Sequence, residues 1–202
     1  MTLARRQSIA AAAIVVAVVV IDQIIKFAVK TGMYLHESIH VTDWFQIVFT
    51  ENNGMAFGME VVPKLLLTSF RIVAVVVIAW YMVRVISRRA PWGYVVCLAL
   101  IVAGAAGNIV DCLFYGMIFD NPMPPFTAQL VPWGEGYGTL MNGRVVDMFY
   151  FPLAEWNWPR WLPLCGGEHF IFFSPIFNFA DSAISCGIVA LLIFYHDRLQ
   201  KL

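Results

Sequence analysis

Four long apolar runs, separated by more polar stretches, dominate the pattern of this sequence. A helix that crosses the hydrocarbon core of a bilayer needs about 20 mostly apolar residues. Four segments have that length and character, and we predict membrane-spanning helices over residues 8–29, 65–86, 93–115 and 175–195. The pattern therefore predicts an all-α membrane protein, with residues 1–202 forming one polytopic domain.

The first run begins as a secretory signal peptide does, because Arg5 and Arg6 precede a stretch rich in Ala and Val. Its helical pattern nevertheless continues past Asp22 to about Val29, and three more spans follow. We therefore expect the first run to be an uncleaved membrane anchor.

Basic residues near the ends of the runs indicate how the chain is oriented, because loops that stay in the cytoplasm carry an excess of Lys and Arg. A chain that crosses four times places three basic groups on one side: Arg5 and Arg6, then Arg84, Arg88 and Arg89, then Arg198 and Lys201. We predict that both termini are cytoplasmic and that the long connections, residues 30–64 and 116–174, lie outside.

The two outer connections carry structural signals of their own. Residues 41–50 (VTDWFQIVFT) are rich in β-branched and aromatic types, which predicts a strand in a small outer sheet. The second connection starts with a loop punctuated by Pro and Gly and continues into WNWPRWLPLC. Tryptophans in such numbers are typical of a membrane–water interface.

Composition narrows the class of protein further. Hydrophobic residues make up 60% of the chain and charged residues 13%, whereas a soluble domain carries roughly 25% charged residues. The formal net charge is zero, so that no basic field favours nucleic acid as a partner. None of the four cysteines is spaced as CxxC, and neither a zinc knuckle nor a redox pair is indicated. Whether Cys112 and Cys165 form a disulfide is left open.

Polar residues inside the apolar runs gather at one depth, toward the outer end of three spans. An ionisable group inside a bilayer costs at least a few kcal/mol and usually faces the protein interior. The spacing of three or four residues puts the members of each pair on one helix face, which predicts a shared site. The pairs are Asp22 with Lys26, Asn108 with Asp111, and Asn178 with Asp181.

Asp181 is the strongest functional candidate among these residues. It lies six residues beyond Pro175, about 9 Å along a helix that starts there, and no cation is near it in the sequence. Residues 103–107 (AGAAG) are small enough to allow a neighbouring helix to approach closely.

The other two pairs have competing structural explanations. Asp22 and Lys26, four residues apart, are expected to form an ion pair that anchors the end of the first helix. For Asn108 and Asp111, structural hydrogen bonding and a functional role are equally supported.

One more carboxylate, Asp147, stands in the apolar segment GRVVDMFYF and is expected to return to the membrane surface. If it meets Asp181, the two carboxyls hold one negative charge between them, because carboxylates in contact resist double ionisation. The ionised member can take a proton from water, and the protonated member can polarise a peptide carbonyl. Peptide hydrolysis without metal or cofactor is therefore our hypothesis, and proton- or ion-coupled transport is the alternative.

Five motifs then occur in order: IDQIIK (residues 21–26), ENNGMAFG (51–58), GAAGNIVD (104–111), GRVVDMF (143–149) and FNFADSAI (177–184). Each motif is weak alone. Together, and with matching spans, they make the sequence resemble lipoprotein signal peptidase, the type II signal peptidase family of bacteria. The resemblance covers most of the chain except its ends and the second outer loop.

This resemblance implies four transmembrane helices with a small extracytoplasmic β-cradle. It implies an aspartic endopeptidase that cleaves diacylglyceryl-modified prolipoproteins just before the lipidated cysteine, with Asp147 and Asp181 as catalytic residues. It gives Asp22 and Lys26 a structural role. Positions that shape the site or contact substrate fall on Asn52, Gly54, Asn108, Asp111 and Asn178.

The resemblance also implies a setting for the protein. We expect a monomer in the bacterial inner membrane, with the active site near the periplasmic face. The expected partners are the prolipoprotein and membrane lipid, and no cofactor or metal is expected.

Two features depart from the family pattern. Members usually carry Arg directly after the aspartate of GNxxD, and here that residue is Cys112, so that Arg144 is a candidate substitute. The link between GNxxD and VVD is normally short, whereas here residues 113–142 intervene. Such a loop could act as a lid or alter substrate access.

A competing motif, HESIH, spells HExxH with His36, Glu37 and His40. On a helix, that spacing binds zinc through two histidines and supplies a glutamate base, which makes a zinc peptidase the third hypothesis. Here the motif follows Gly32, outside the first span, and runs into a strand-like stretch. Transport is also less favoured, because one polar cluster near one face offers no midplane path.

Overall fold

The computed structural model describes residues 1–53 and 63–199, and within them four helices are long and apolar enough to cross a membrane. These helices are α1 (Leu3–Gly32), α2 (Lys64–Ser87), α3 (Trp92–Val110) and α5 (Phe179–Leu199). A π-helical turn, η2 (Asp111–Tyr115), and the short α4 (Gly116–Ile118) continue α3. The predicted fold class, four apolar helices with small sheets, is confirmed.

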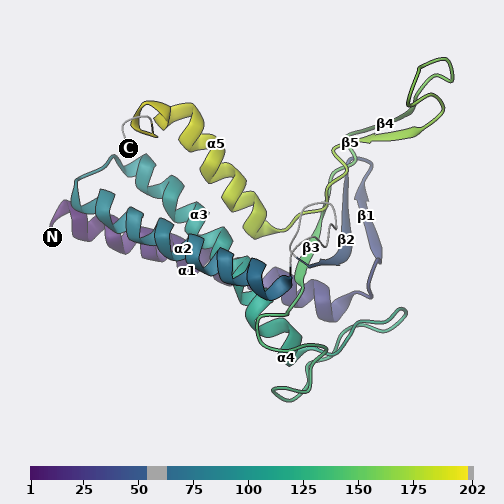
Figure 1. The fold of residues 1–202 in the computed structure, drawn as a ribbon, viewed down its shortest axis with the longest axis horizontal. Coiled ribbons are helices and arrows are strands. Elements are labelled where there is room, and N and C mark those ends of the chain that lie inside the picture. The colour runs from purple at the N-terminus through teal and green to yellow at the C-terminus, as the bar shows by residue number, and fades with distance from the viewer. Residues whose placement is uncertain (54–62, 200–202) are drawn as a thin grey trace.

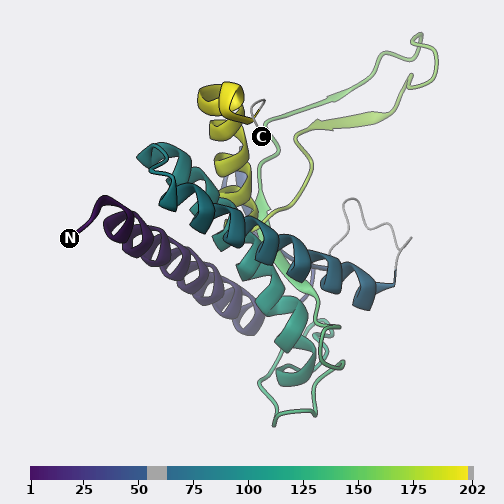
Figure 2. The same ribbon diagram turned by 60° about the vertical axis from the view of Figure 1, so that its left-hand side comes forward.

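Helix α3 is the centre of the bundle, with α1, α2 and α5 packed against it (Figures 1 and 2). Most of the apolar side chains of α3 are buried, whereas α1, α2 and α5 leave many of theirs exposed. In a membrane protein such outward apolar side chains face lipid. Helix α1 begins, and α5 ends, at the end of the bundle opposite the strands.

The small residues of α3 allow α5 to approach closely, as the AGAAG segment predicts. A Cβ atom added to Gly104 would lie 2.2 Å from the backbone oxygen of Ala180 in α5. A Cβ on Gly187 of α5 would in turn lie 2.7 Å from the backbone oxygen of Cys97. These glycines bring the first turn of α5 against the polar end of α3.

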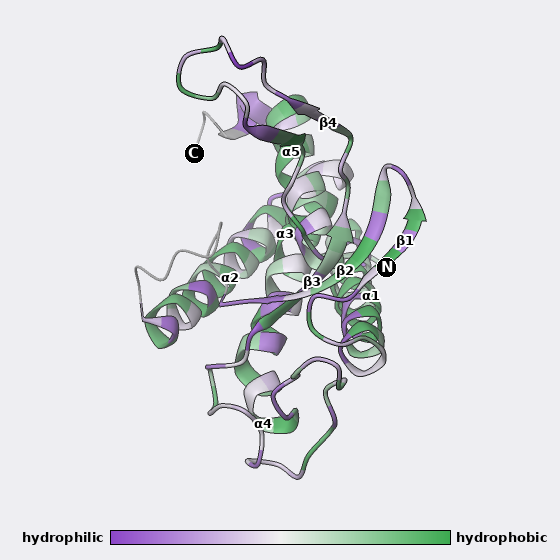
Figure 3. Cartoon of the chain, turned by 90° about the vertical axis from the view of Figure 1, so that its right-hand side faces the viewer, coloured by the Kyte–Doolittle hydropathy of each residue, from purple (hydrophilic) through white to green (hydrophobic). Residues whose placement is uncertain are grey.

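A three-stranded antiparallel sheet covers that end, with the order β1 (Ser38–Thr42), β2 (Phe45–Asn52), β3 (Val145–Tyr150). Figure 3, viewed from the side of the sheet, shows it in front of mainly apolar helices. The prediction of one strand over residues 41–50 is wrong, because a turn at Asp43 and Trp44 divides that segment between β1 and β2. The inner face of the sheet buries Phe49, Val146 and Met148.

Helix α5 starts later than predicted, at Phe179 instead of Pro175. The backbone of Phe177 exchanges two hydrogen bonds with Phe149 of β3, at 2.8 and 3.1 Å, so that this stretch extends the sheet. Asp181 therefore lies in the first turn of α5, and the expected depth of about 9 Å inside the helix is wrong.

The second outer connection forms two separate structures. Residues 119–142 fold back on the end of α3, where Tyr137 and Gly138 donate backbone hydrogen bonds to Phe119 and Gly116. The hairpin of β4 (Ala154–Asn157) and β5 (His169–Phe172) projects away from the bundle (Figure 1). The residues of WNWPRWLPLC thus lie on this hairpin.

Candidate active site

The NxxD motif at the start of α5 is a helix cap. The side-chain oxygen of Asn178 accepts a hydrogen bond from the backbone N–H of Asp181 at 2.8 Å, and Asp181 Oδ2 accepts one from the N–H of Asn178 at 3.2 Å. This reciprocal arrangement is a capping box, with Asp in the place of Glu, and it satisfies two free N–H groups of the helix end. The cap holds the Asp181 carboxylate in one orientation.

Asp147 comes to the same place from the sheet. In the register of β2 and β3 it pairs with Thr50, and its side chain is 2% exposed. Asn178 Nδ2 donates to Asp147 Oδ1 at 2.7 Å, and Asn52 donates to the other oxygen, Oδ2. A single residue, Asn178, therefore binds both carboxylates, one through its side chain and one through its backbone.

Asn108 of α3 completes this cluster with a fixed amide orientation. Lys26 Nζ and Asn178 Nδ2 both donate to Asn108 Oδ1, at 2.8 and 3.0 Å. Neither of these donor groups can accept a hydrogen bond, so that the Asn108 oxygen must face them. Its Nδ2 is thereby directed to Asp181 Oδ1, at 2.8 Å.

Beneath this layer lies a fully buried ion network. Lys26 pairs with Asp22 at 3.0 Å and with Asp111 at 2.7 Å, and all three side chains are 0% exposed. Asp22 also accepts a hydrogen bond from the backbone N–H of Ala180 at 2.9 Å, which ties α1 to the first turn of α5. The expected ion pair of Asp22 and Lys26 is therefore present and extends to a third residue.

Gln23 also belongs to this network, although it was not among the site residues predicted from the sequence. Its Nε2 donates to Asp111 at 2.8 Å and to Asp22 at 3.2 Å, and its Oε1 accepts from the Tyr115 hydroxyl at 3.1 Å. A glutamine beside an intramembrane aspartate was the available signal, because a buried amide must find partners.

Asp111 links this network to the sheet. Its Oδ2 accepts from the backbone N–H of Val146 at 3.3 Å, one residue before Asp147. A Cβ atom on Gly143 would lie 2.0 Å from the backbone oxygen of Asp111, so that only glycine fits where β3 enters. Asp111 and Gly143 thus fix the position of Asp147 without contacting its carboxylate.

The two candidate catalytic carboxylates lie in different environments. Burial, and then the nearby charge of Asp181, raise the pKa of Asp147 to about 7, whereas the hydrogen bond from Asn178 acts to lower it. Asp181 is only half-buried. The arrangement can therefore hold a protonated carboxyl on Asp147 beside the more exposed carboxyl group of Asp181.

The Arg144 side chain has partners other than Cys112, although the backbone N–H of its neighbour Gly143 donates to the Cys112 carbonyl at 2.8 Å. The Arg144 guanidinium pairs with Glu51 at 3.1 Å and donates to Asn121 at 2.9 Å, and Glu51 also binds the buried Lys30. The arginine at Cys112 is Arg71 of α2, whose Nη1 lies 3.6 Å from the Cys112 sulfur. Arg71 was identifiable in the sequence as a charged residue well inside the second apolar run.

The HExxH segment does not form a helix. His36 has a φ of 69° in a turn, and His40 lies in strand β1, both with exposed side chains. Among the described residues, no group of three or more His, Cys, Asp or Glu side chains is arranged to hold a metal ion. The zinc-peptidase hypothesis loses its geometric basis.

The remaining site residues can be placed as follows. Asp22, Lys26, Asn52, Asn108, Asp111, Asp147, Asn178 and Asp181 come together in one connected cluster. Gly54 lies outside the described residues. All four cysteines are free thiols, including Cys112 and Cys165.

Known proteins are similar to this chain along nearly its whole length. The family model described as signal peptidase (SPase) II matches residues 14–196. A lipoprotein signal peptidase of Porphyromonas gingivalis is 50% identical over 192 residues, which cover 95% of this chain and 84% of the relative. The lipoprotein signal peptidase of Amoebophilus asiaticus is 34% identical over 194 residues, which cover 91% of this chain and 76% of the relative.

Two solved structures have a similar fold. Both are described as bacterial membrane enzymes, at 1.9 and 2.3 Å resolution, with TM-scores of 0.59 and 0.61. The first is 24% identical and covers 91% of this chain and 90% of its own. The second is 22% identical, with coverages of 96% and 92%. At these identities the likeness concerns the fold, and it agrees with the four-helix architecture.

Proposed function

Because this chain belongs to the signal peptidase II family, we propose that it removes signal peptides from diacylglyceryl-modified prolipoproteins, with Asp147 and Asp181 as the catalytic pair. The family assignment confirms the expectation of a signal peptidase II-type endopeptidase in a multi-pass bacterial membrane protein. The aspartic mechanism, the cleavage point before the lipidated cysteine and the residue roles are our proposals. The observation that carries them is the hydrogen bonding of both carboxylates by Asn178.

In this mechanism the half-buried Asp181 is the base and the buried Asp147 is the acid. Asp181 takes a proton from a water molecule, whose oxygen attacks the scissile carbonyl carbon, while Asp147 gives its proton to the carbonyl oxygen. The resulting diol collapses when Asp147 recovers a proton from the hydroxyl group. Asp181 then protonates the leaving nitrogen as the C–N bond breaks. Both carboxyls return to their starting states.

The three asparagines position this pair, and each has a separate task. Asn178 and Asn52 hold Asp147 through its two oxygens, and Asn108 directs Asp181. Asp111 positions β3 through the backbone of Val146. Arg144 shapes the site from the side, since it pairs with Glu51, the neighbour of Asn52. Gly54 remains a candidate substrate contact outside the described residues.

We propose that Arg71 provides the guanidinium group which the family pattern places at the position of Cys112. It reaches the Cys112 sulfur from α2, so that a positive donor stands beside the GNxxD segment although the sequence motif lacks it. An arginine inside a membrane span is expensive, which favours a functional role over a structural accident. Its task is to bind a carbonyl or ester oxygen of the lipidated substrate.

The orientation follows from the placement of charge. The catalytic cluster lies at the sheet end of the bundle, and the arginines of the α2–α3 link and of the α5 end lie at the other. By the positive-inside rule, the arginine-rich end is cytoplasmic and the site is near the periplasmic face of the inner membrane. We also propose that the protein acts as a monomer and as one polytopic domain, since α1, α3, α5 and the sheet all contribute to the site.

The test uses the purified chain in detergent with a diacylglyceryl-modified prolipoprotein. Wild type, Asp147→Asn and Asp181→Asn are compared, each with and without a metal chelator. We expect cleavage by wild type alone, just before the lipidated cysteine and insensitive to chelator. Cleavage that survives both substitutions would overturn the catalytic assignment. Cleavage of the non-lipidated precursor at the same rate would overturn the substrate assignment.

A further inference from the structure

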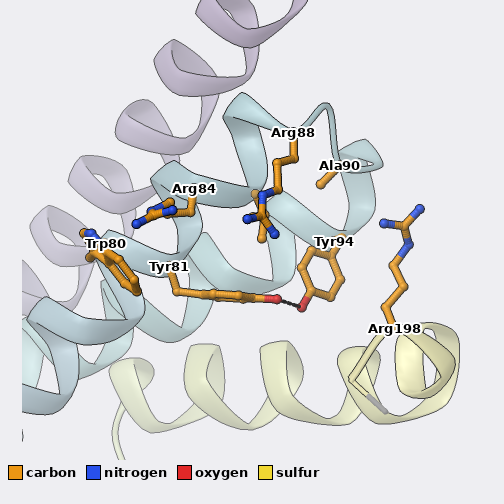
Figure 4. Close-up of a pocket in the computed structure, with 8 residues that line it drawn as sticks. Trp80, Tyr81, Arg84, Arg88, Ala90, Tyr94 and Arg198 are labelled. Atoms are coloured by element: carbon orange, nitrogen blue, oxygen red, sulfur yellow. Dashed lines mark hydrogen bonds between the residues drawn. The ribbon is translucent and has the colours of Figure 1, made fainter. Parts of the chain in front are cut away.

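A cavity of about 510 Å³ lies at the end of the bundle opposite the catalytic cluster. It occupies the space between α2, the start of α3 and the end of α5, as Figure 4 shows. Its lining residues are Trp80, Tyr81, Arg84, Val85, Arg88, Ala90, Tyr94 and Arg198. Three arginines and three aromatic residues thus surround one hollow that the proteolytic reaction does not use.

Within residues 1–53 and 63–199, the arginines of this cavity, Arg84, Arg88 and Arg198, form no ion pair with a carboxylate. The nearest acidic residue in sequence, Asp197, contacts His196 instead, at 2.8 Å. Three guanidinium groups around one space repel each other, and an anion between them relieves that repulsion.

Part of the cavity wall is held by side-chain contacts, although the three arginines are exposed. The hydroxyls of Tyr81 and Tyr94 are hydrogen bonded at 2.7 Å and present polar atoms to the cavity. The Arg84 guanidinium stacks on the Trp80 ring at 4.7 Å, which holds its position while leaving its edge available for hydrogen bonds. Held groups lose little freedom when a ligand binds.

A bend in α5 brings the third arginine to this cavity. Tyr195 has non-helical backbone angles (φ −135°, ψ 16°), which redirect the last turn that carries Arg198. Its ring packs edge-on against Tyr94 at 5.4 Å, and a Cβ atom on Gly93 would lie 2.2 Å from the Tyr195 hydroxyl. Gly93 therefore leaves room for the Tyr195 hydroxyl, and Figure 4 shows Arg88 and Arg198 on either side of Tyr94.

We propose that this cavity binds the phosphate of an anionic phospholipid headgroup from the adjacent leaflet. Arg88 and Arg198 bind the phosphate oxygens, and the Tyr81–Tyr94 pair hydrogen bonds the headgroup. In the orientation proposed above, that leaflet is the cytoplasmic one. The inference goes beyond the proteolytic function and does not depend on it.

A phospholipid fits better than a soluble phosphate because of what lies beside the cavity. Exposed apolar side chains continue from it along both helices that flank it, namely Val76 and Val77 on α2 and Ile188 and Leu192 on α5. Trp80, which lines the cavity, is itself 57% exposed, and tryptophans favour the membrane–water interface. The acyl chains of a phospholipid can pack on this apolar surface, whereas a soluble anion has no apolar group that could do so.

The test compares lipid binding by the full chain in detergent, measured by native mass spectrometry and by the gain in thermal stability. The probes are phosphatidylglycerol, phosphatidylcholine and the soluble anions glycerol 3-phosphate and inorganic phosphate. The variants are Arg88→Gln/Arg198→Gln and, as a matched control from the same link, Arg89→Gln, which does not line the cavity. Each basic residue near an anionic lipid contributes about fivefold in affinity, so that the double variant should bind phosphatidylglycerol roughly 25-fold more weakly.

Phosphatidylglycerol should bind to wild type and to Arg89→Gln in preference to phosphatidylcholine, and the double variant should lose this preference. An equal loss in Arg89→Gln would mean a diffuse charge effect and would overturn the site. Saturation by either soluble anion at equal affinity would overturn the lipid assignment. Cleavage of prolipoprotein in detergent should remain unchanged in all three proteins, which separates a failure here from a failure of the proposed catalytic function.

Discussion

The two ends of this helical bundle differ in whether their clustered charged side chains have partners within the protein. At the sheet end, Lys26, Asp22 and Asp111 are completely buried, and each has partners within the protein. At the other end, Arg88 and Arg198 surround a cavity without any carboxylate partner among the described residues. Internally satisfied charge builds a rigid site, whereas unsatisfied charge marks a place for a partner from outside.

The rigidity at the sheet end also explains how one region serves both folding and chemistry. The capping box of Asn178 and Asp181 satisfies the first N–H groups of α5, and the same two residues belong to the proposed catalytic cluster. Removing either residue disturbs both tasks. The experiments below separate the chemical task from the structural one, beginning with the largest effect.

The largest effect is expected for substitution of either aspartate by its amide. Asp147→Asn and Asp181→Asn should each lower kcat/KM by about 10³-fold, because general acid–base groups contribute between 10² and 10⁴. Cleavage of lipidated precursor in detergent is the measurement. Thermal unfolding of each variant serves as the control, since an amide of equal size preserves most of the packing. Activity within tenfold of wild type in either variant would contradict the assignment.

The buried ion network should show the next largest effect, on stability. Lys26→Met leaves Asp22 and Asp111 buried without a cation, which is expected to destabilise the protein by about 3–5 kcal/mol. The double variant Lys26→Met/Asp111→Asn removes one of the uncompensated charges and should regain part of that loss. Thermal unfolding in one detergent compares them. Equal stability of Lys26→Met and wild type would show that the network is dispensable.

The environment of Asp147 predicts a dependence on pH. Its pKa is raised to about 7 in the folded protein, so that the acid form needed for catalysis is lost as pH rises through that value. The logarithm of kcat/KM should then fall with a slope near −1 above pH 7, about tenfold per unit. A flat profile from pH 6 to 9 would contradict the role of Asp147 as acid.

The same shift has a consequence for stability, with a defined sign. The unfolded chain releases this proton near pH 4, whereas the folded chain keeps it until about 7. The contribution of Asp147 to stability is therefore present at low pH and is lost between pH 4 and 7. Asp147→Asn should remove this part of the pH dependence of the unfolding midpoint, which provides a control independent of activity.

A smaller effect is expected for Arg71. Arg71→Ala should lower kcat/KM about tenfold, because it removes one charge-assisted hydrogen bond to the substrate. The double variant Arg71→Ala/Cys112→Arg returns a guanidinium to the same place from η2 and should recover activity. Lack of recovery together with normal unfolding would show that Arg71 acts otherwise than proposed. An unchanged single variant would remove it from the site.

The smallest effect is expected for the HExxH segment. His36→Ala/His40→Ala should cleave within about twofold of wild type, as is usual for exposed side chains away from a site. Treatment with chelator should leave the variant and the wild type equally active. A loss of activity only in the presence of chelator would instead support the zinc-peptidase hypothesis for this motif.

The sequence by itself determined the membrane class, the four apolar helices and the three polar pairs that these helices bring together, because hydropathy and helical spacing are local properties. The predictions from sequence failed where the backbone forms hydrogen bonds with a segment that is distant along the chain. Residues 175–178 were predicted to be helical. In the structure the backbone of Phe177 instead forms two hydrogen bonds with Phe149 of β3. Residues 41–50 were predicted to form one strand. In the structure a turn divides them between β1 and β2, and Phe49 of β2 is buried.

Only the tertiary structure decided which arginine contacts the Cys112 sulfur, that Asn178 hydrogen bonds both carboxylates, and that three arginines line one cavity. Arg71 and Cys112 are 41 residues apart, and Asn178 and Asp147 are 31 apart. Such contacts depend on how helices and the sheet dock against one another. Docking is set by the shape of packed side chains such as Gly104 and Gly143, where a single added carbon would clash. The spacing of residues along the chain does not determine that shape.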